Sequence, residues 1–193
     1  MGGSYLGNAG IFLVDSIFGL YILLVLLRFL FQWVRADFYN PISQFIVTAT
    51  NPPLVFTRRF IPGIWGLDLA SIVVMLALAA LKVYLLAWMG GANPKFTGVM
   101  VFAIGELLQL TVYVFMVAVI IRVILSWMGP RSYNPVVGLL HSLTEPVMGP
   151  ARRLLPPMGG LDLSPIVVFI VLGLALRLIV QPILDIGRAL AIA

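Results

Sequence analysis

Hydrophobic residues dominate four long stretches of the chain, at about residues 11–33, 69–89, 99–127 and 163–184. Each stretch has at least the roughly 20 apolar residues that an α-helix needs to cross the hydrocarbon core of a bilayer. Backbone polar groups in lipid must bond within their own segment, so such stretches form helices. The pattern predicts an all-α integral membrane protein with four transmembrane helices.

Two segments between these stretches have helical periodicity but no long apolar run. Their apolar positions are Ile42, Phe45, Ile46 and Ala49 in the first, and Val136, Leu139, Leu140 and Leu143 in the second. This is the i, i+3, i+4, i+7 spacing of an amphipathic helix. At about ten residues, each reaches about 15 Å, so we expect an interfacial or re-entrant helix. Pro52-Pro53 and Pro146 should break it, with a second short piece following.

The polar residues show that the two halves of the chain repeat each other at an offset of 94 positions (122 − 28). The matching residues are Arg28, Trp33, Asn40-Pro41, Arg58-Arg59 and Asp68 in the first copy, and Arg122, Trp127, Asn134-Pro135, Arg152-Arg153 and Asp162 in the second. Each copy contains two spans, which predicts two tandem parallel αα repeats in the same orientation. We place the first repeat at residues 1–98 and the second at residues 99–193.

Composition excludes several classes of protein. Of the 193 residues 62% are hydrophobic and 10% are charged, against roughly 25% charged residues in soluble domains. The absence of cysteine excludes disulfides and thiolate metal sites. A lone histidine, His141, does not make a metal site, and the sequence has no nucleophile–base pair or phosphate-binding glycine loop. We expect no enzyme, no cofactor and no metal.

The basic residues predict the orientation of the chain in the membrane. The loops that join the two spans of each repeat contain Arg35, Arg58, Arg59, Arg131, Arg152 and Arg153. Lys95 lies between the repeats and Arg188 lies in the tail. The positive-inside rule places the loops within the repeats in the cytoplasm and both termini outside. Orientation also explains the net charge of +5, so we expect no nucleic acid partner.

Charged residues inside the spans are the first candidates for a site, because a charge in the bilayer is costly and usually has a partner. Arg28 and Arg122 lie about 8 Å inside the tryptophan ends of their spans. They either snorkel to the interface or pair with Asp68 and Asp162, which begin the next spans. The competing interpretation of both aspartates is helix N-capping, a role that Ser164 could take in the second copy.

A second charged layer is expected toward the opposite end of the spans. Asp15 and Lys82 form one acid–base pair, and Glu106 and Arg177 form another. We expect both pairs to face the bundle interior, where they either lock helices together or line a polar path. Glycines within the spans, such as Gly173, should allow close helix packing.

Candidates for lipid or partner contact lie at the predicted cytoplasmic ends of the spans. They are Arg58, Arg59, Arg152, Arg153, Asn40, Asn134, Trp33 and Trp127. The tryptophans fit an aromatic belt, and the arginines either set topology or meet anionic headgroups at roughly 1 kcal/mol each. The expected partners are membrane lipids, in particular anionic ones, and a protein partner or a second copy of the chain.

The repeated motifs resemble those of the YggT family of bacterial integral membrane proteins, also called YlmG. The second copy carries the full pattern: Asn134-Pro135, Thr144-Glu145-Pro146, Arg152-Arg153 and Asp162-Leu163-Ser164-Pro165. The first copy departs from it with Asn51 where Glu145 stands and with Ala70-Ser71 where Ser164-Pro165 stand. The resemblance implies a multi-pass protein of the bacterial inner membrane.

Relatives in that family are associated with osmotic and potassium homeostasis in some bacteria, and with nucleoid, division or cytochrome-assembly phenotypes in other lineages. The resemblance is compatible with two functions. The first is a non-enzymatic membrane organiser or assembly factor with a role in envelope homeostasis. The alternative is a small ion-transport or channel component in osmotic and potassium homeostasis. We favour the first, because the sequence has no recognisable ion-coordinating filter or broken transmembrane helix.

Overall fold

The computed structural model describes residues 5–63, 66–127, 134–155 and 162–192. The elements are α1 (Tyr5–Trp33), α2 (Pro41–Arg58), α3 (Leu69–Met89), α4 (Phe96–Trp127), α5 (Pro135–Leu154), α6 (Ser164–Ala175), the π-helical turn η1 (Leu176–Val180) and α7 (Gln181–Ile192). Within these ranges, four helices are long and apolar enough to cross a membrane, namely α1, α3, α4 and the continuous α6–η1–α7. The predicted all-α membrane fold is confirmed.

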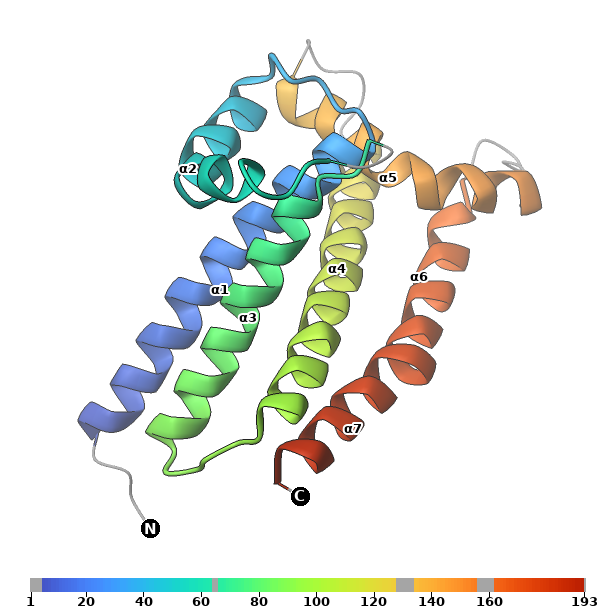
Figure 1. Cartoon of the computed structure of the whole chain (residues 1–193). Helices are drawn as coiled ribbons and strands as arrows, with labels where there is room; N and C mark the ends of the chain where they lie inside the picture. The colour runs from blue at the N-terminus through green and yellow to red at the C-terminus, as the bar shows by residue number, and fades with distance from the viewer. Residues whose placement is uncertain (1–4, 64–65, 128–133, 156–161, 193) are drawn as a thin grey trace.

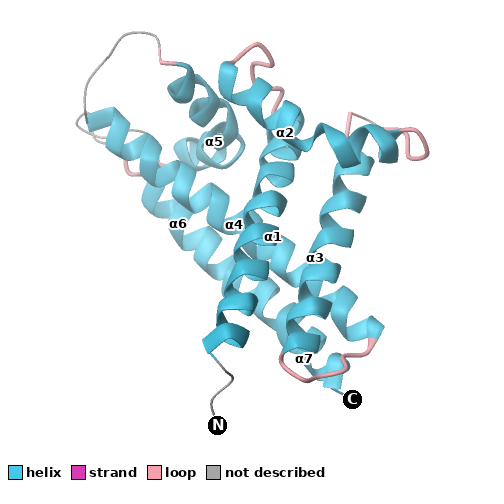
Figure 2. Ribbon diagram, turned by 90° about the vertical axis from the view of Figure 1, so that its left-hand side faces the viewer, coloured by secondary structure: helices cyan, strands magenta, loops and turns pink. Residues whose placement is uncertain are grey.

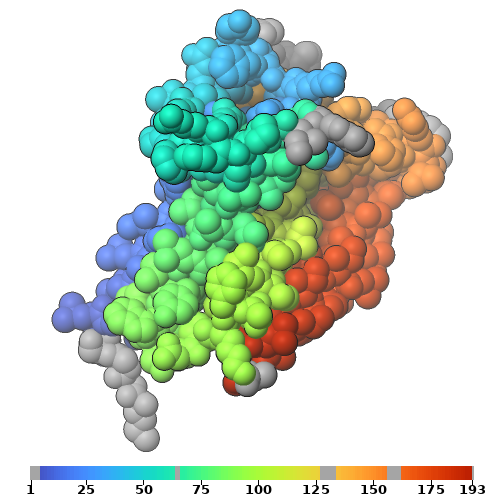
Figure 3. All heavy atoms as spheres, in the orientation of Figure 1, coloured from blue at the N-terminus to red at the C-terminus, as the bar shows by residue number. Residues whose placement is uncertain are grey.

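The spans run side by side, and α2 and α5 lie across one end of the bundle (Figure 1). The chain begins and ends at the opposite end of the bundle, as the second view also shows (Figure 2). Helix α3 packs between α1 and α4, and α4 packs against α7. In the space-filling view, α2 and part of α5 cover the end of the spans (Figure 3).

The main cluster of buried apolar residues joins both loop helices to the spans. Leu54 of α2 and Met148 of α5 are completely or almost completely buried, as are Val25 of α1 and Val119 of α4. The apolar face of each loop helix is therefore partly used inside the protein. This contact fixes α2 and α5 to the end of the bundle.

Both loop helices continue through their prolines, so the predicted breaks are wrong. Helix α2 has 18 residues and contains Pro52 and Pro53, and α5 has 20 residues and contains Pro146. A proline leaves the carbonyl four residues before it without an amide donor. The carbonyl of Ala49, which Pro53 leaves free, accepts a hydrogen bond from the Tyr21 hydroxyl of α1 at 3.4 Å. Tertiary contact thus supplies a donor that the helix lacks.

The fourth span extends beyond the predicted residue 184 and contains one irregularity. The backbone amide of Gln181 donates to the carbonyl of Leu176, five residues earlier, in the π-helical turn η1. Pro182 follows directly and has no amide to donate to the preceding turn. A π-helical turn at this point accommodates the proline while the helix continues.

Close packing between α4 and α7 depends on glycines. A Cβ atom at Gly98 would lie 2.1 Å from the backbone nitrogen of Ala191, and one at Gly187 would lie 2.6 Å from that of Phe102. The backbones approach this closely only because no side chain intervenes. Gly173, the glycine predicted to serve packing, has open space where its Cβ would be. That prediction is wrong.

Candidate functional site

The repeated polar residues meet where the loop helices cross the end of the bundle. Arg28 of α1 is buried, with 7% of its side chain exposed. Its Nη1 donates to the carbonyl oxygen of Val47 at 3.1 Å, to Thr50 Oγ1 at 2.9 Å and to Asn51 Oδ1 at 2.9 Å. All three acceptors belong to α2. Arg28 therefore fastens α2 to the first span.

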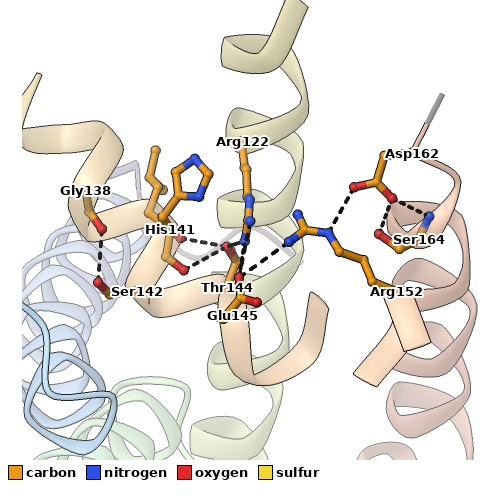
Figure 4. A network of polar contacts seen from close by, with 10 residues as sticks. Arg122, Gly138, His141, Ser142, Thr144, Glu145, Arg152, Asp162 and Ser164 are labelled. Carbon is orange, nitrogen blue, oxygen red and sulfur yellow. Dashed lines mark hydrogen bonds and ion pairs between the residues drawn. The ribbon is translucent and has the colours of Figure 1, made fainter. Parts of the chain in front are cut away.

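Arg122 makes the equivalent contacts in the second copy (Figure 4). Its Nη1 donates to Thr144 Oγ1 at 2.6 Å, and both Nη atoms lie 3.3 Å from Glu145 Oε2. Arg152 Nη1 approaches the same carboxylate oxygen at 3.6 Å. In the second copy, unlike the first, the buried arginine thus has a carboxylate partner.

Asp68 and Asp162 bind other arginines than the ones predicted. Asp68 Oδ2 accepts from Arg58 Nη2 at 2.5 Å, and Asp162 Oδ2 accepts from Arg152 Nε at 3.1 Å. The predicted pairings with Arg28 and Arg122 are therefore wrong. Each aspartate instead ties the C-terminal end of a loop helix to the start of the following span. We call these two ion pairs the clamps.

A serine completes each clamp. The Ser71 hydroxyl donates to Asp68 Oδ2 at 2.5 Å. The backbone amide and the hydroxyl of Ser164 both donate to Asp162 Oδ1, the amide at 3.0 Å. The N-cap residue of α6 is Leu163, and Asp68 stands at the N-cap of α3 without a side-chain capping hydrogen bond, so the capping interpretation is wrong for both aspartates. Burial raises the pKa of each aspartate, but the hydrogen bonds from serine and arginine outweigh it and hold the pKa below its ordinary value.

The two Arg-Arg pairs each divide into an inner and an outer residue. The inner residues, Arg58 and Arg152, belong to the clamps. The outer residues, Arg59 and Arg153, are exposed, and neither forms an ion pair with any residue that the structure describes. Of these four arginines, only the outer two are free to meet lipid or a partner without breaking a clamp.

The two asparagines begin the loop helices. Asn40 Oδ1 accepts from the amide of Ile42 at 3.0 Å, and Asn134 Oδ1 accepts from the amide of Val136 at 2.9 Å. Both are N-caps. Asn40 Nδ2 also donates to the carbonyl of Pro135 at 2.7 Å, which links the starts of α2 and α5.

The tryptophans of the candidate set end the first span of each repeat. Trp33 is half exposed at the end of α1. The side chain of Trp127 lies outside the described part of the structure. Of the two predicted aromatic-belt residues, Trp33 alone can therefore be placed, and it stands at the expected end of its span.

The outer charged layer contains a triad in place of two pairs. Lys82 Nζ of α3 lies 3.4 Å from Asp15 Oδ1 of α1 and 3.0 Å from Glu106 Oε1 of α4. The predicted pair of Glu106 and Arg177 is wrong. Arg177 is exposed on η1, whereas α3 packs between α1 and α4 and brings Lys82 to both acids.

Sequence reasoning missed two residues that hold the buried arginines. Thr50 and Thr144 are completely buried and bond both their arginine and the carbonyl four residues earlier. They are separated by the repeat offset (144 − 50 = 94), which is the signal that could have identified them. Within the described ranges, no group of three or more His, Cys, Asp or Glu residues is placed to hold a metal ion.

The family model described as CCB3/YggT matches the chain twice, at residues 7–89 and at residues 101–183. The chain belongs to the CCB3/YggT family. The two YggT matches each contain one buried arginine and one clamp. The predicted resemblance, with its two tandem repeats, is confirmed.

Relatives support the YggT assignment over most of the chain. An uncharacterized protein of Pseudomonas aeruginosa is 46% identical over 178 residues, which cover 91% of this chain and 90% of that protein. The uncharacterized protein YggT of Escherichia coli K12 is 34% identical over 167 residues, or 86% of each chain. A chloroplastic YlmG homolog of Arabidopsis thaliana is 41% identical over 54 residues, which cover 28% of this chain and 21% of that protein. No solved structure matches the chain.

Proposed function

We propose that this YggT-family chain is a non-enzymatic protein of the bacterial inner membrane that organises membrane components through lipid or protein contacts. In this proposal, α2 and α5 lie at the cytoplasmic surface and both termini lie outside, with a role in envelope homeostasis. The observation that carries the proposal is the duplicated clamp. It fixes two amphipathic helices at one end of the bundle and leaves one exposed arginine beside each.

The exposed residues of α2 fit a membrane surface. Phe45, Val55 and Phe56 are exposed on this helix, and Phe60 is exposed just after it. Arg59 lies among them without an ion pair in the described part of the chain. Exposed aromatic and aliphatic side chains next to a free basic residue are typical of helices that bind the interface of anionic membranes.

Removing the two outer arginines tests this proposal. Arg59→Gln with Arg153→Gln should reduce the preference for phosphatidylglycerol over phosphatidylcholine by about fivefold per arginine, since each basic residue near an anionic surface contributes roughly 1 kcal/mol. The preference can be measured in liposomes by the quenching of tryptophan fluorescence with brominated lipids. Arg59→Lys with Arg153→Lys keeps both charges and should leave the preference unchanged. An unchanged preference in the Arg59 and Arg153 variant would contradict the proposal.

Ion transport is the second candidate function, and one observation favours it. Lys82, Glu106 and Gln109 line a cavity of about 170 Å³, and Glu106 Oε2 is buried without a hydrogen-bond partner among the described residues. The triad nevertheless pairs Lys82 with two carboxylates, which favours a lock between helices.

Flux measurements separate the two candidate functions. Under the organiser proposal, liposomes containing the protein should take up potassium and protons no faster than empty liposomes. A Glu106→Gln variant should leave this baseline unchanged, because a lock between helices carries no ions. Flux that exceeds the baseline and is lost in Glu106→Gln would support the transport function instead.

A further inference from the structure

Arg28 is a buried cation without an ion pair. All seven acidic residues of the chain lie in the described ranges, and none forms an ion pair with Arg28. Its acceptors, on Val47, Thr50 and Asn51, are uncharged. Other bases without an ion pair in the described part of the chain are exposed, whereas Arg28 is 7% exposed. A buried charge is costly unless an opposite charge compensates it.

The second repeat shows how the same arginine is compensated within the chain. Glu145 stands 94 positions after Asn51 and approaches Arg122 at 3.3 Å. Asn51 occupies the corresponding place beside Arg28 and accepts a hydrogen bond, but it carries no charge. One substitution between the copies thus leaves the first arginine without a carboxylate in direct contact.

A cavity of about 330 Å³ lies next to Arg28, between the end of α1 and α2. Arg28, Arg35 and Arg58 line it, together with Gln32 and Ser43. Asp68 forms its ion pair with Arg58, so Arg28 and Arg35 are the two arginines of the cavity without an ion pair among the described residues. Ser43 is 5% exposed, and its Oγ has no hydrogen-bond partner among the described residues. The cavity therefore offers charge and an unused hydroxyl donor.

Arg35 stands at the rim of this cavity in a strained backbone conformation. Its φ of 53° lies in the left-handed region, which favours glycine and strains other residues. Gly129 stands at the corresponding position of the second copy, where Ser43 is likewise replaced by Val137. At positions 35, 43 and 51, the first copy carries the residue better suited to an anion.

We propose that this cavity binds a phosphate group, carried by an anionic phospholipid headgroup or present as free phosphate. Guanidinium groups match the geometry of phosphate oxygens and hold them by charge-assisted hydrogen bonds. Arg28 and Arg35 provide the charge, and the Ser43 hydroxyl donates a further hydrogen bond. If the phosphate belongs to a lipid headgroup, the inference rests on the proposed function and specifies one of its lipid contacts.

Native mass spectrometry of the purified protein tests the site. The probes are phosphatidylglycerol, phosphatidylcholine and inorganic phosphate, each titrated separately. Asn51→Glu places a carboxylate beside Arg28, as Glu145 does beside Arg122, and should weaken phosphate-group binding at least tenfold. The same arrangement exists in the second copy, so this variant should fold. Gln44→Glu, on an exposed position of the same helix, adds an equal charge and should bind within twofold of the unaltered protein.

The probes also identify the source of the phosphate. Tight binding of phosphatidylglycerol with weak binding of inorganic phosphate assigns the site to a lipid, and equal binding of both assigns it to free phosphate. Ser43→Ala should weaken the preferred probe about threefold. Binding that is unchanged in Asn51→Glu, or phosphatidylcholine binding as tight as that of phosphatidylglycerol, would overturn the proposal.

The test of the cavity does not depend on the test of the outer arginines, Arg59 and Arg153. Asn51→Glu leaves Arg59 and Arg153 in place, so it tests the cavity alone. If the Arg59 and Arg153 variant keeps its lipid preference while Asn51→Glu loses phosphate binding, the proposed function fails and the site remains. The reverse result removes the site and leaves the proposed function intact.

Discussion

Replacing Gly187 with leucine is expected to separate α4 from α7 and to lower the free energy of unfolding by about 3 kcal/mol. A Cβ atom at this position would lie 2.6 Å from the backbone nitrogen of Phe102. Because backbone atoms cannot move aside as a side-chain end can, one helix must shift. The loss of stability can be measured as a lower thermal unfolding midpoint in detergent.

Gly173→Leu is the matched control for this result. It places the same side chain in the same span, at a position where nothing lies within 4 Å of the new Cβ. We expect its unfolding midpoint to equal or exceed that of the unaltered protein, because leucine favours helix over glycine. Equal losses in the two variants would show that glycine does not hold α4 and α7 together.

Asp68→Asn is expected to destabilise the protein by about 2 kcal/mol, because it leaves Arg58 without its counterion at a partly buried site. The Asp68 side chain is 5% exposed, whereas that of Asp162 is 36% exposed. Asp162→Asn, the same change in the second copy, should therefore lower the free energy of unfolding by less. Unfolding by a denaturing detergent measures both. Equal losses would contradict the view that burial sets the strength of the clamps.

The pH dependence of stability gives a second readout of Asp68→Asn. In the folded protein, the carboxyl of Asp68 has a pKa below the ordinary 3.8. As the pH falls, Asp68 therefore binds a proton in the unfolded chain before it does so in the folded protein. The stabilisation by Asp68 is complete above the ordinary pKa and is lost as the pH drops through the folded-state pKa. The unaltered protein should therefore lose more stability below pH of about 4 than Asp68→Asn does.

Periodicity and repetition in the sequence were enough to predict the spans and their tandem order. They predicted poorly which polar groups meet. Arg28 and Asp68 lie at similar depth along their helices, but Arg28 bonds α2, and Asp68 bonds the arginine at the end of α2. That outcome depends on the path of the loop helix across the bundle. The prolines in the sequence predict an end to this helix. The sequence does not reveal that a donor on another helix, the Tyr21 hydroxyl, bonds a carbonyl that a proline leaves free.

The sequence also did not reveal which face of each helix packs against a neighbouring helix. Gly173 and Gly187 look alike in an apolar stretch, yet only Gly187 faces another helix. Likewise, Glu106 and Arg177 are predicted to pair because both fall toward the outer half of their spans, but Lys82 of α3 reaches Glu106 instead. The rotation of each helix about its axis decides such contacts, and it is fixed by packing of the whole bundle.

The hydrogen bond from Asn40 to Pro135 gives the two loop helices a mechanical relation. It joins their starting points, whereas the clamps anchor their far ends to different spans. Arg28 and Arg122 also bond the middle of these helices to α1 and α4. Because the starts of α2 and α5 are bonded to each other, a displacement of either repeat at this end of the bundle strains a contact with the other repeat.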